Sequence, residues 1–242
     1  AIYVIRSKHF RNYLKSFTLR AVNWVRSFGI LKIGAPVAMQ YTFEVSAFSA
    51  AAIFIGTIGA VEQAAHQVAI NLASMTYMMA SGISSAATIK TGNNFGKEDF
   101  MNLRLSAISS YHIVLAFMAI AAILFIGLNQ YLPWIYTSDE SVIHIAAQLL
   151  IIAGFFQLFD GTQVVGLGVL RGIGDVNIPT IITFVAYWII GLPVGYYLGI
   201  SLGMGANGVW YGLTAGLLVS SGLLFLRFQF FSKKLVRLVH KE

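Results

Sequence analysis

Long hydrophobic stretches alternate along the chain with short stretches rich in charged residues, glycine and proline. Each hydrophobic stretch has about 20 residues or more, the length that an α-helix needs to cross a hydrocarbon core of roughly 30 Å. A transmembrane β-barrel would show alternating segments of about ten residues instead. The pattern predicts an all-α membrane protein with six transmembrane helices, at Ile33–Ile55, Val68–Ile89, Leu105–Leu128, Val142–Leu170, Ile178–Ile200 and Ala206–Phe228.

The last two predicted helices carry glycine at every fourth position. Small residues at this spacing form a smooth ridge, along which membrane helices approach each other closely. We therefore expect close helix packing at two ridges, which consist of Gly191, Gly195, Gly199 and Gly203 in one helix and Gly208, Gly212 and Gly216 in the other.

The charge distribution predicts the topology. Of the 242 residues, 57% are hydrophobic and 10% are charged, and the net charge is +7. If the N-terminus is cytoplasmic, all 16 Lys and Arg residues lie on the cytoplasmic side, and only Glu62, Asp139 and Glu140 are charged on the other. The positive-inside rule then places both termini in the cytoplasm of a multi-pass inner-membrane protein. The basic charge thus reports topology and not a nucleic-acid partner.

Composition also divides the chain into three parts. Residues 1–28 are expected to form a cytoplasmic amphipathic connector, either on the membrane surface or in solvent. Residues 29–228 form the transmembrane lobe, and residues 229–242 a basic cytoplasmic tail that binds anionic membrane lipid. The chain begins at Ala1 without a methionine, which suggests a piece of a longer protein.

Two acidic residues, Glu44 and Asp160, fall near the middle of predicted helices. Such a charge costs about 2.5 to 3.5 kcal/mol, so it persists mainly where it faces a cavity, a partner or an ion path. Every Lys and Arg is expected near the cytoplasmic surface, so the two acids must be protonated, share a proton or bind a cation. The alternative is a structural pair, with Asp160 protonated and hydrogen-bonded between helices. Neighbouring polar residues that are candidates for lining a cleft are Gln40, Tyr41, Gln157 and Gln163.

An enzyme is not expected. The Gly172-Ile-Gly174-Asp175 run matches the G-x-G-D of intramembrane aspartyl proteases, but Asp160 lies about 22 Å away along one helix. An aspartyl dyad needs its two carboxyl groups in contact. Asp175 is expected to form a helix-ending ion pair with Arg171, and His66 is interpreted as a capping or interfacial residue. No cofactor is predicted.

Three motifs resemble the C-terminal half of multidrug and toxic compound extrusion (MATE) transporters, nearest the NorM-like branch. They are Phe43-Glu44-Val45-Ser46-Ala47-Phe48, Ala64-Ala65-His66-Gln67-Val68-Ala69-Ile70-Asn71, and Leu170-Arg171-Gly172-Ile173-Gly174-Asp175 followed by Pro179. The resemblance implies a six-helix lobe that pairs with an N-terminal six-helix lobe around a central cleft. It also implies secondary active efflux of cationic or amphipathic small molecules in antiport with Na⁺ or H⁺.

By this resemblance Glu44 and Asp160 match acids that bind a monovalent cation, so Na⁺ is expected at that pair. Tyr77 is similar to a tyrosine that helps to hold the cation, and Asp139 to an acid near the substrate mouth. Phe156 replaces a tyrosine of some members and removes an oxygen ligand. Two alternatives stay open: a flippase of the same superfamily for lipids or lipid-linked saccharides, and a purely structural half. The flippase predicts basic residues in the cleft.

Overall fold

The computed structural model describes residues 23–239, and this part of the chain is almost entirely helical. The predicted connector falls mostly in residues 1–22, outside the described residues. The elements are α3 (Trp24–Ile58), α4 (Ala60–Gly96), α5 (Phe100–Gly127), the 3₁₀ turn η2 (Leu132–Ile135), α6 (Glu140–Gly172), α7 (Asn177–Phe184), η3 (Val185–Gly191), α8 (Leu192–Tyr196), η4 (Tyr197–Ser201) and α9 (Gly205–Val239).

The six predicted spans all lie in helical segments, so the all-α prediction is confirmed. Five segments of the described chain are long and apolar enough to cross a membrane. The other one, α4, has 37 residues but is more polar, because it carries many serine, threonine and asparagine side chains. The fifth span is not a single α-helix: two π-helical stretches, η3 and η4, flank the short α8.

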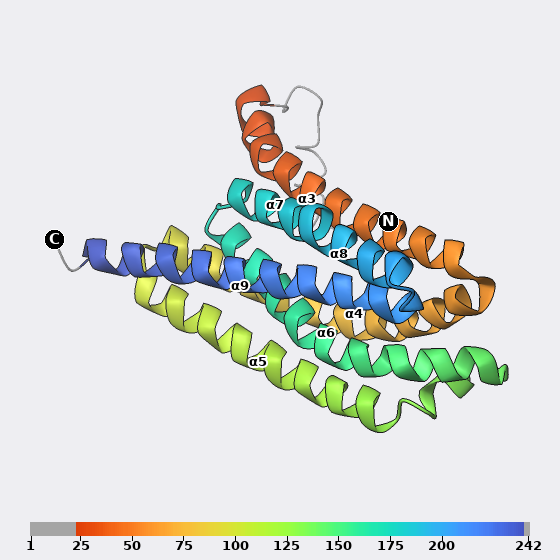
Figure 1. Ribbon diagram of the computed structural model, residues 1–242. Coiled ribbons are helices and arrows are strands. Elements are labelled where there is room, and N and C mark those ends of the chain that lie inside the picture. The colour runs from red at the N-terminus through yellow and green to blue at the C-terminus, as the bar shows by residue number, and fades with distance from the viewer. Residues whose placement is uncertain (1–22, 240–242) are drawn as a thin grey trace, which may run out of the picture.

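Helix α6 lies at the centre of the bundle, between α4, α5 and α9, whereas α3 runs along one edge beside α7 and α8 (Figure 1). Of the apolar stretch that qualifies α6 as a membrane span, 61% is buried, compared with 22% for α3. Small residues explain the close contact of α6 with α4. The hydroxyl of Ser84 donates to the Val164 carbonyl at 2.6 Å, and that of Thr88 donates to the Gly168 carbonyl at 2.8 Å.

The glycine ridges pack against each other, as predicted. A Cβ atom added at Gly212 would overlap the backbone of Gly195, and one added at Gly216 would lie 2.8 Å from the carbonyl oxygen of Ala186. Any side chain would therefore push α9 away from the segment formed by η3, α8 and η4. Gly203 does not belong to this contact, because it lies in the turn before α9 with φ +68°.

The stretch between the first two predicted spans, residues 56–67, is almost entirely helical. Only Gly59 separates α3 from α4, so Glu62 and His66 are helical. Glu62 instead caps another helix: its Oε2 accepts from the backbone N–H of Ala206 at 2.9 Å, at the start of α9. The compositional boundaries at residues 28/29 and 228/229 both fall inside helices, α3 and α9.

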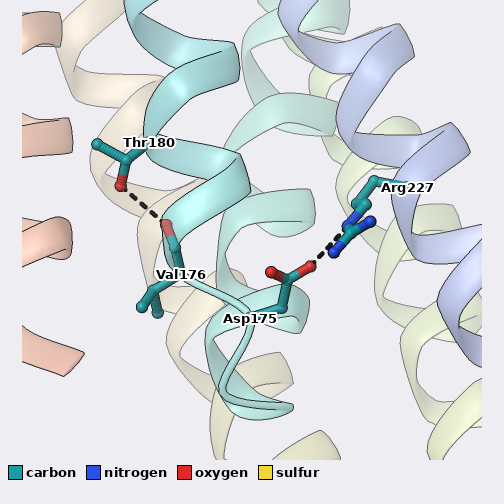
Figure 2. Close-up of polar contacts among 4 residues, drawn as sticks. All are labelled: Asp175, Val176, Thr180 and Arg227. Atoms are coloured by element: carbon teal, nitrogen blue, oxygen red, sulfur yellow. Dashed lines mark hydrogen bonds and ion pairs between the residues drawn. The ribbon is translucent and has the colours of Figure 1, made fainter. Parts of the chain in front are cut away.

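An ion pair fastens α9 at the other end of the bundle. Arg227 Nε lies 2.8 Å from Asp175 Oδ2, in the turn between α6 and α7 (Figure 2). The predicted pairing of Asp175 with Arg171 is therefore wrong. Asp175 follows the last turn of α6 and faces α9. Its partner Arg227 is 52 positions away in the sequence, so the local pattern around Asp175 could not indicate it. Arg104 reinforces this end by donating to Ser232 and Gln229 of α9.

Candidate functional site

A cavity of about 410 Å³ lies between α3, α4 and α6. Its apolar wall includes Phe48, Ile70 and Phe156. Its polar lining comes from all three helices and consists of Tyr41, Glu44, Ser49, His66, Gln67, Ser74, Tyr77 and Asp160. Because hydroxyl, amide and carboxyl groups converge in a mostly apolar enclosure, the cavity has the character of a small-ligand or ion site.

Glu44 of α3 and Asp160 of α6 both line this cavity, and both are buried, with 6% and 4% of their surface exposed. The structure thus brings the two membrane acids together, although they are 116 positions apart in the sequence. Tyr77 of α4 lines the same cavity. That these three residues hold a cation stays a prediction.

A chain of hydrogen bonds lies behind Glu44. Gln163 Nε2 is 3.4 Å from Glu44 Oε1 and 3.0 Å from the hydroxyl of Tyr187, which comes from the π-helical η3. Tyr187 is fully buried. Sequence reasoning missed Tyr187, because a tyrosine in an apolar stretch is usually a core or interface residue. The signal that could have found it was the placement of an aromatic hydroxyl in mid-span, away from the interface.

His66 is not a capping or interfacial residue. It is 2% exposed, lines the cavity, and its Nδ1 accepts from Trp210 Nε1 at 3.1 Å. An indole nitrogen can only donate, so this bond requires an unprotonated Nδ1 and leaves the proton of neutral His66 on Nε2. The interpretation from sequence failed because the partner, Trp210, lies 144 positions away on α9.

The cavity also has a basic neighbour, contrary to the expectation that no Lys or Arg reaches the two acids. The guanidinium carbon of Arg171 lies 5.4 Å from the ring centroid of Tyr41, which lines the cavity. Tyr41 precedes Glu44 by three residues on α3, so the guanidinium stacks on a helical neighbour of this carboxylate. Arg171 is in the last turn of α6, and a long side chain can extend back along its own helix.

The other cleft candidates take different positions. Gln40, Gln157 and Gln163 are buried within the lobe and are not among the residues that line the cavity. Asp139 is exposed and caps α6, where its Oδ1 accepts from the backbone N–H of Ser141 at 2.9 Å. That these four residues line the cleft of a complete transporter stays a prediction.

The donor set suits a proton or a small hard cation. Two carboxyl groups and a phenol hydroxyl supply only oxygen atoms, which are typical ligands of alkali and alkaline-earth ions and not of zinc or copper. Within residues 23–239 no group of three or more His, Cys, Asp and Glu side chains could hold a metal ion. Phe156, which packs on Phe48 and Trp210, adds no oxygen to this wall.

Helices long and apolar enough to cross a membrane, with two buried acids on one cavity, define a multi-pass membrane protein. The MatE family profile matches residues 36–197, and the chain belongs to this family. It is 37% identical over 217 residues to a probable multidrug resistance protein NorM of Agrobacterium fabrum, with 88% of this chain and 47% of the relative covered. It is 35% identical over 236 residues to the multidrug resistance protein MdtK of Photorhabdus laumondii, with 96% and 52% covered.

Solved structures agree on the fold. The chain superimposes with a TM-score of 0.87 and 20% identity on the eukaryotic MATE transporter AtDTX14, covering 98% of this chain and 53% of that one. The Vibrio cholerae MATE transporter VcmN in its bent form gives a TM-score of 0.79 at 16% identity, with 96% and 53% covered. The chain therefore spans about half the length of its relatives, as expected for one lobe of a two-lobe transporter.

Proposed function

We propose that the complete protein is a secondary active multidrug efflux transporter. It exports cationic or amphipathic compounds in antiport with Na⁺ or H⁺, and this chain supplies the lobe that holds the coupling ion. The observation that carries the proposal is the convergence of Glu44 and Asp160 on one cavity from different helices. The names of the relatives, which are multidrug resistance proteins, support the efflux activity.

In the mechanism, a cation enters from outside and binds between Glu44 and Asp160, with Tyr77 as a further oxygen donor. Its binding favours the inward-facing arrangement, and drug and ion alternate in the cleft between this lobe and an N-terminal six-helix lobe. Coupling requires that the ion bind the two arrangements with different affinity. The lobe lies in the inner membrane, and both of its termini are cytoplasmic, where basic residues concentrate.

The test compares two acid-to-amide variants of the complete protein in proteoliposomes. Asp160→Asn removes a cavity carboxylate, and Glu98→Gln removes an exposed one in the turn between α4 and α5. We expect Asp160→Asn to abolish cationic-dye efflux driven by a Na⁺ or a pH gradient, and Glu98→Gln to retain it. Unimpaired efflux by Asp160→Asn at normal expression would remove the assignment of the site. Comparing the two gradients identifies the coupling ion.

A flippase for lipids or lipid-linked saccharides is the second candidate. The position of Arg171 favours this function, because a guanidinium beside the cavity could bind a lipid phosphate. The sequence alone had not indicated a basic residue there. The same proteoliposomes distinguish the two functions: movement of a fluorescent phospholipid between leaflets, without ion-driven dye efflux, would support the flippase. Ion-driven dye efflux without movement of the phospholipid would support the multidrug efflux function.

A further inference from the structure

A guanidinium contacts one of the residues that line the acidic cavity. Arg171 lies over the ring of Tyr41, with its Cζ 5.4 Å from the ring centroid. Tyr41 lines the cavity and precedes Glu44 by three residues on α3, so the two side chains lie on neighbouring positions of one helix face. The guanidinium thus stacks on a cavity residue that is about one helical turn from Glu44, and it comes from the helix that carries Asp160.

Within residues 23–239, no carboxylate forms an ion pair with Arg171. The ion pair at this end of the lobe joins Asp175 to Arg227. Within the described residues, the Nε of Arg171 is buried and has no hydrogen-bond partner. Arg171 as a whole is partly buried, and an opposite charge within reach stabilises a partly buried charge that has no ion-pair partner. Of the two cavity carboxylates, Glu44 is the one that shares α3 with Tyr41, the ring on which Arg171 stacks.

We propose that Arg171 is the internal counter-charge of the cation site and sets its affinity. When the site holds no cation, the guanidinium compensates the carboxylate of Glu44. An arriving cation must bind against this positive charge, so the site releases its ion more readily than two carboxylates alone would. The inference rests on the proposed function, because it assigns the regulation of affinity at the same site.

The stack on Tyr41 explains why an arginine suits this position. A planar guanidinium stacks on an aromatic ring and stays charged at any physiological pH. The ring therefore holds the charge beside Glu44 without a direct salt bridge to it. Such a direct bridge would occupy the carboxylate oxygens that a cation needs. Loss of the ring should free the guanidinium to approach Glu44 and compete more strongly.

The experiment measures ion affinity in the purified complete protein. Na⁺ is titrated while tryptophan fluorescence is recorded, and proton binding is measured in parallel by pH titration without Na⁺. We expect Arg171→Gln to raise the affinity for the coupling ion by about tenfold, since a like charge is removed at a distance of roughly one or two helical turns. Arg171→Lys should change it less. Lys90→Gln removes the same charge from an exposed position of α4 and should leave it unchanged.

The direction of the change separates this role from a structural one. Damage to the fold would lower ion affinity, whereas loss of a counter-charge raises it. Tyr41→Leu and Tyr41→Phe provide a second test, because both lose the hydroxyl group but only Tyr41→Leu loses the ring. A freed guanidinium should make ion binding weaker in Tyr41→Leu than in Tyr41→Phe. Unchanged or weaker ion binding by Arg171→Gln, with Asp160→Asn still abolishing binding, overturns this inference alone. Ion binding that survives Asp160→Asn overturns the proposed function as well.

Discussion

Helices α3 and α6 each contribute one acid to the cavity, but they are held in the lobe very differently. The apolar stretch of α6 is 61% buried and that of α3 only 22%. Glycine residues of α6 let its backbone approach α4 closely, and serine and threonine hydroxyls of α4 donate hydrogen bonds to α6 carbonyls. Side-chain contacts hold α3, such as the Thr180 hydroxyl on the Pro36 carbonyl and the indole of Trp188 on the Phe43 carbonyl.

This difference indicates how an ion could act on the lobe. A cation between Glu44 and Asp160 joins a firmly packed helix to an edge helix with few links. Ion binding would then alter the position of α3 more than that of α6, since the element with fewer buried contacts is easier to displace.

The α4–α6 contact should be the least tolerant of added volume. Gly168→Ala places a methyl group against Ser84, 2.6 Å from its carbonyl oxygen. We expect the free energy of unfolding to fall by about 3 kcal/mol, because backbone atoms cannot move aside as a flexible side chain can. Thermal unfolding of the detergent-solubilised protein measures the change. Gly222→Ala on α9 is the control, since nothing described lies within 4 Å of its added methyl group. Equal stability of the two variants would contradict the close α4–α6 contact.

Two buried glutamines of α6 should respond to the same substitution in opposite directions. Gln163→Leu removes the hydrogen bonds to Glu44 and Tyr187 and should destabilise the lobe by about 2 kcal/mol, because these groups are left unsatisfied. Both amide atoms of Gln157 are buried without a partner in the described region. Gln157→Leu should therefore be neutral or stabilising by about 1 kcal/mol. Chemical unfolding in detergent measures both, and a large loss with Gln157→Leu would show an unseen partner.

The attachment of α3 to α7 should depend on one hydroxyl group. The Oγ1 of Thr180 lies 2.9 Å from the Pro36 carbonyl on α3 and 2.8 Å from the Val176 carbonyl of its own segment, the second contact being drawn in Figure 2. Thr180→Val should cost about 1 kcal/mol and speed hydrogen exchange in α3. Thr183→Val is the matched control, because among the described residues the Thr183 hydroxyl bonds only within its own helix, to the Pro179 carbonyl. Equal exchange rates in α3 for both variants would exclude this link.

The smallest effect is expected at Asp139, the cap of α6. Hydrogen bonds from Ser141 lower the pKa of the Asp139 carboxyl below its ordinary value of 3.8. The cap therefore contributes its full stability above pH 3.8, and the contribution is lost as the pH falls through the lower folded-state pKa. Thermal melting of Asp139→Asn and of the unsubstituted protein should converge as the pH is lowered through that range. Curves that stay a constant distance apart would show that the cap does not titrate there.

The hydrophobic pattern predicted most of the fold. Its six spans, the helix class and the packing of the two glycine ridges follow from local properties: length, apolar composition and a four-residue repeat. The two π-helical stretches in the fifth span could not be predicted, because they depend on how Tyr187 and its neighbours pack against other helices. The helix ends were also misplaced, since the helices that contain Glu62 and Lys233 continue beyond their apolar stretches.

The membrane acids could be found from sequence because a charge in an apolar span stands out whatever surrounds it. Their hydrogen-bond and ionic partners could not. These partners lie on other segments of the chain, in stretches whose composition gives no sign of a polar contact. They are Trp210 for His66, Arg227 for Asp175 and Tyr187 for Gln163. Arg171 was assigned to the surface because it is close to a helix end, although its side chain extends back to Tyr41.

The amino-acid pattern alone is enough to predict that this protein crosses a membrane as helices, that it resembles the MATE transporters, and that Glu44 and Asp160 are exceptional. That these acids share a cavity, that Gln163 contacts one of them and that Arg171 stacks on Tyr41 became visible only in the folded chain. This division arises because apolar composition and helix periodicity are properties of one segment. The direction and partner of a polar side chain depend on which segments pack beside it.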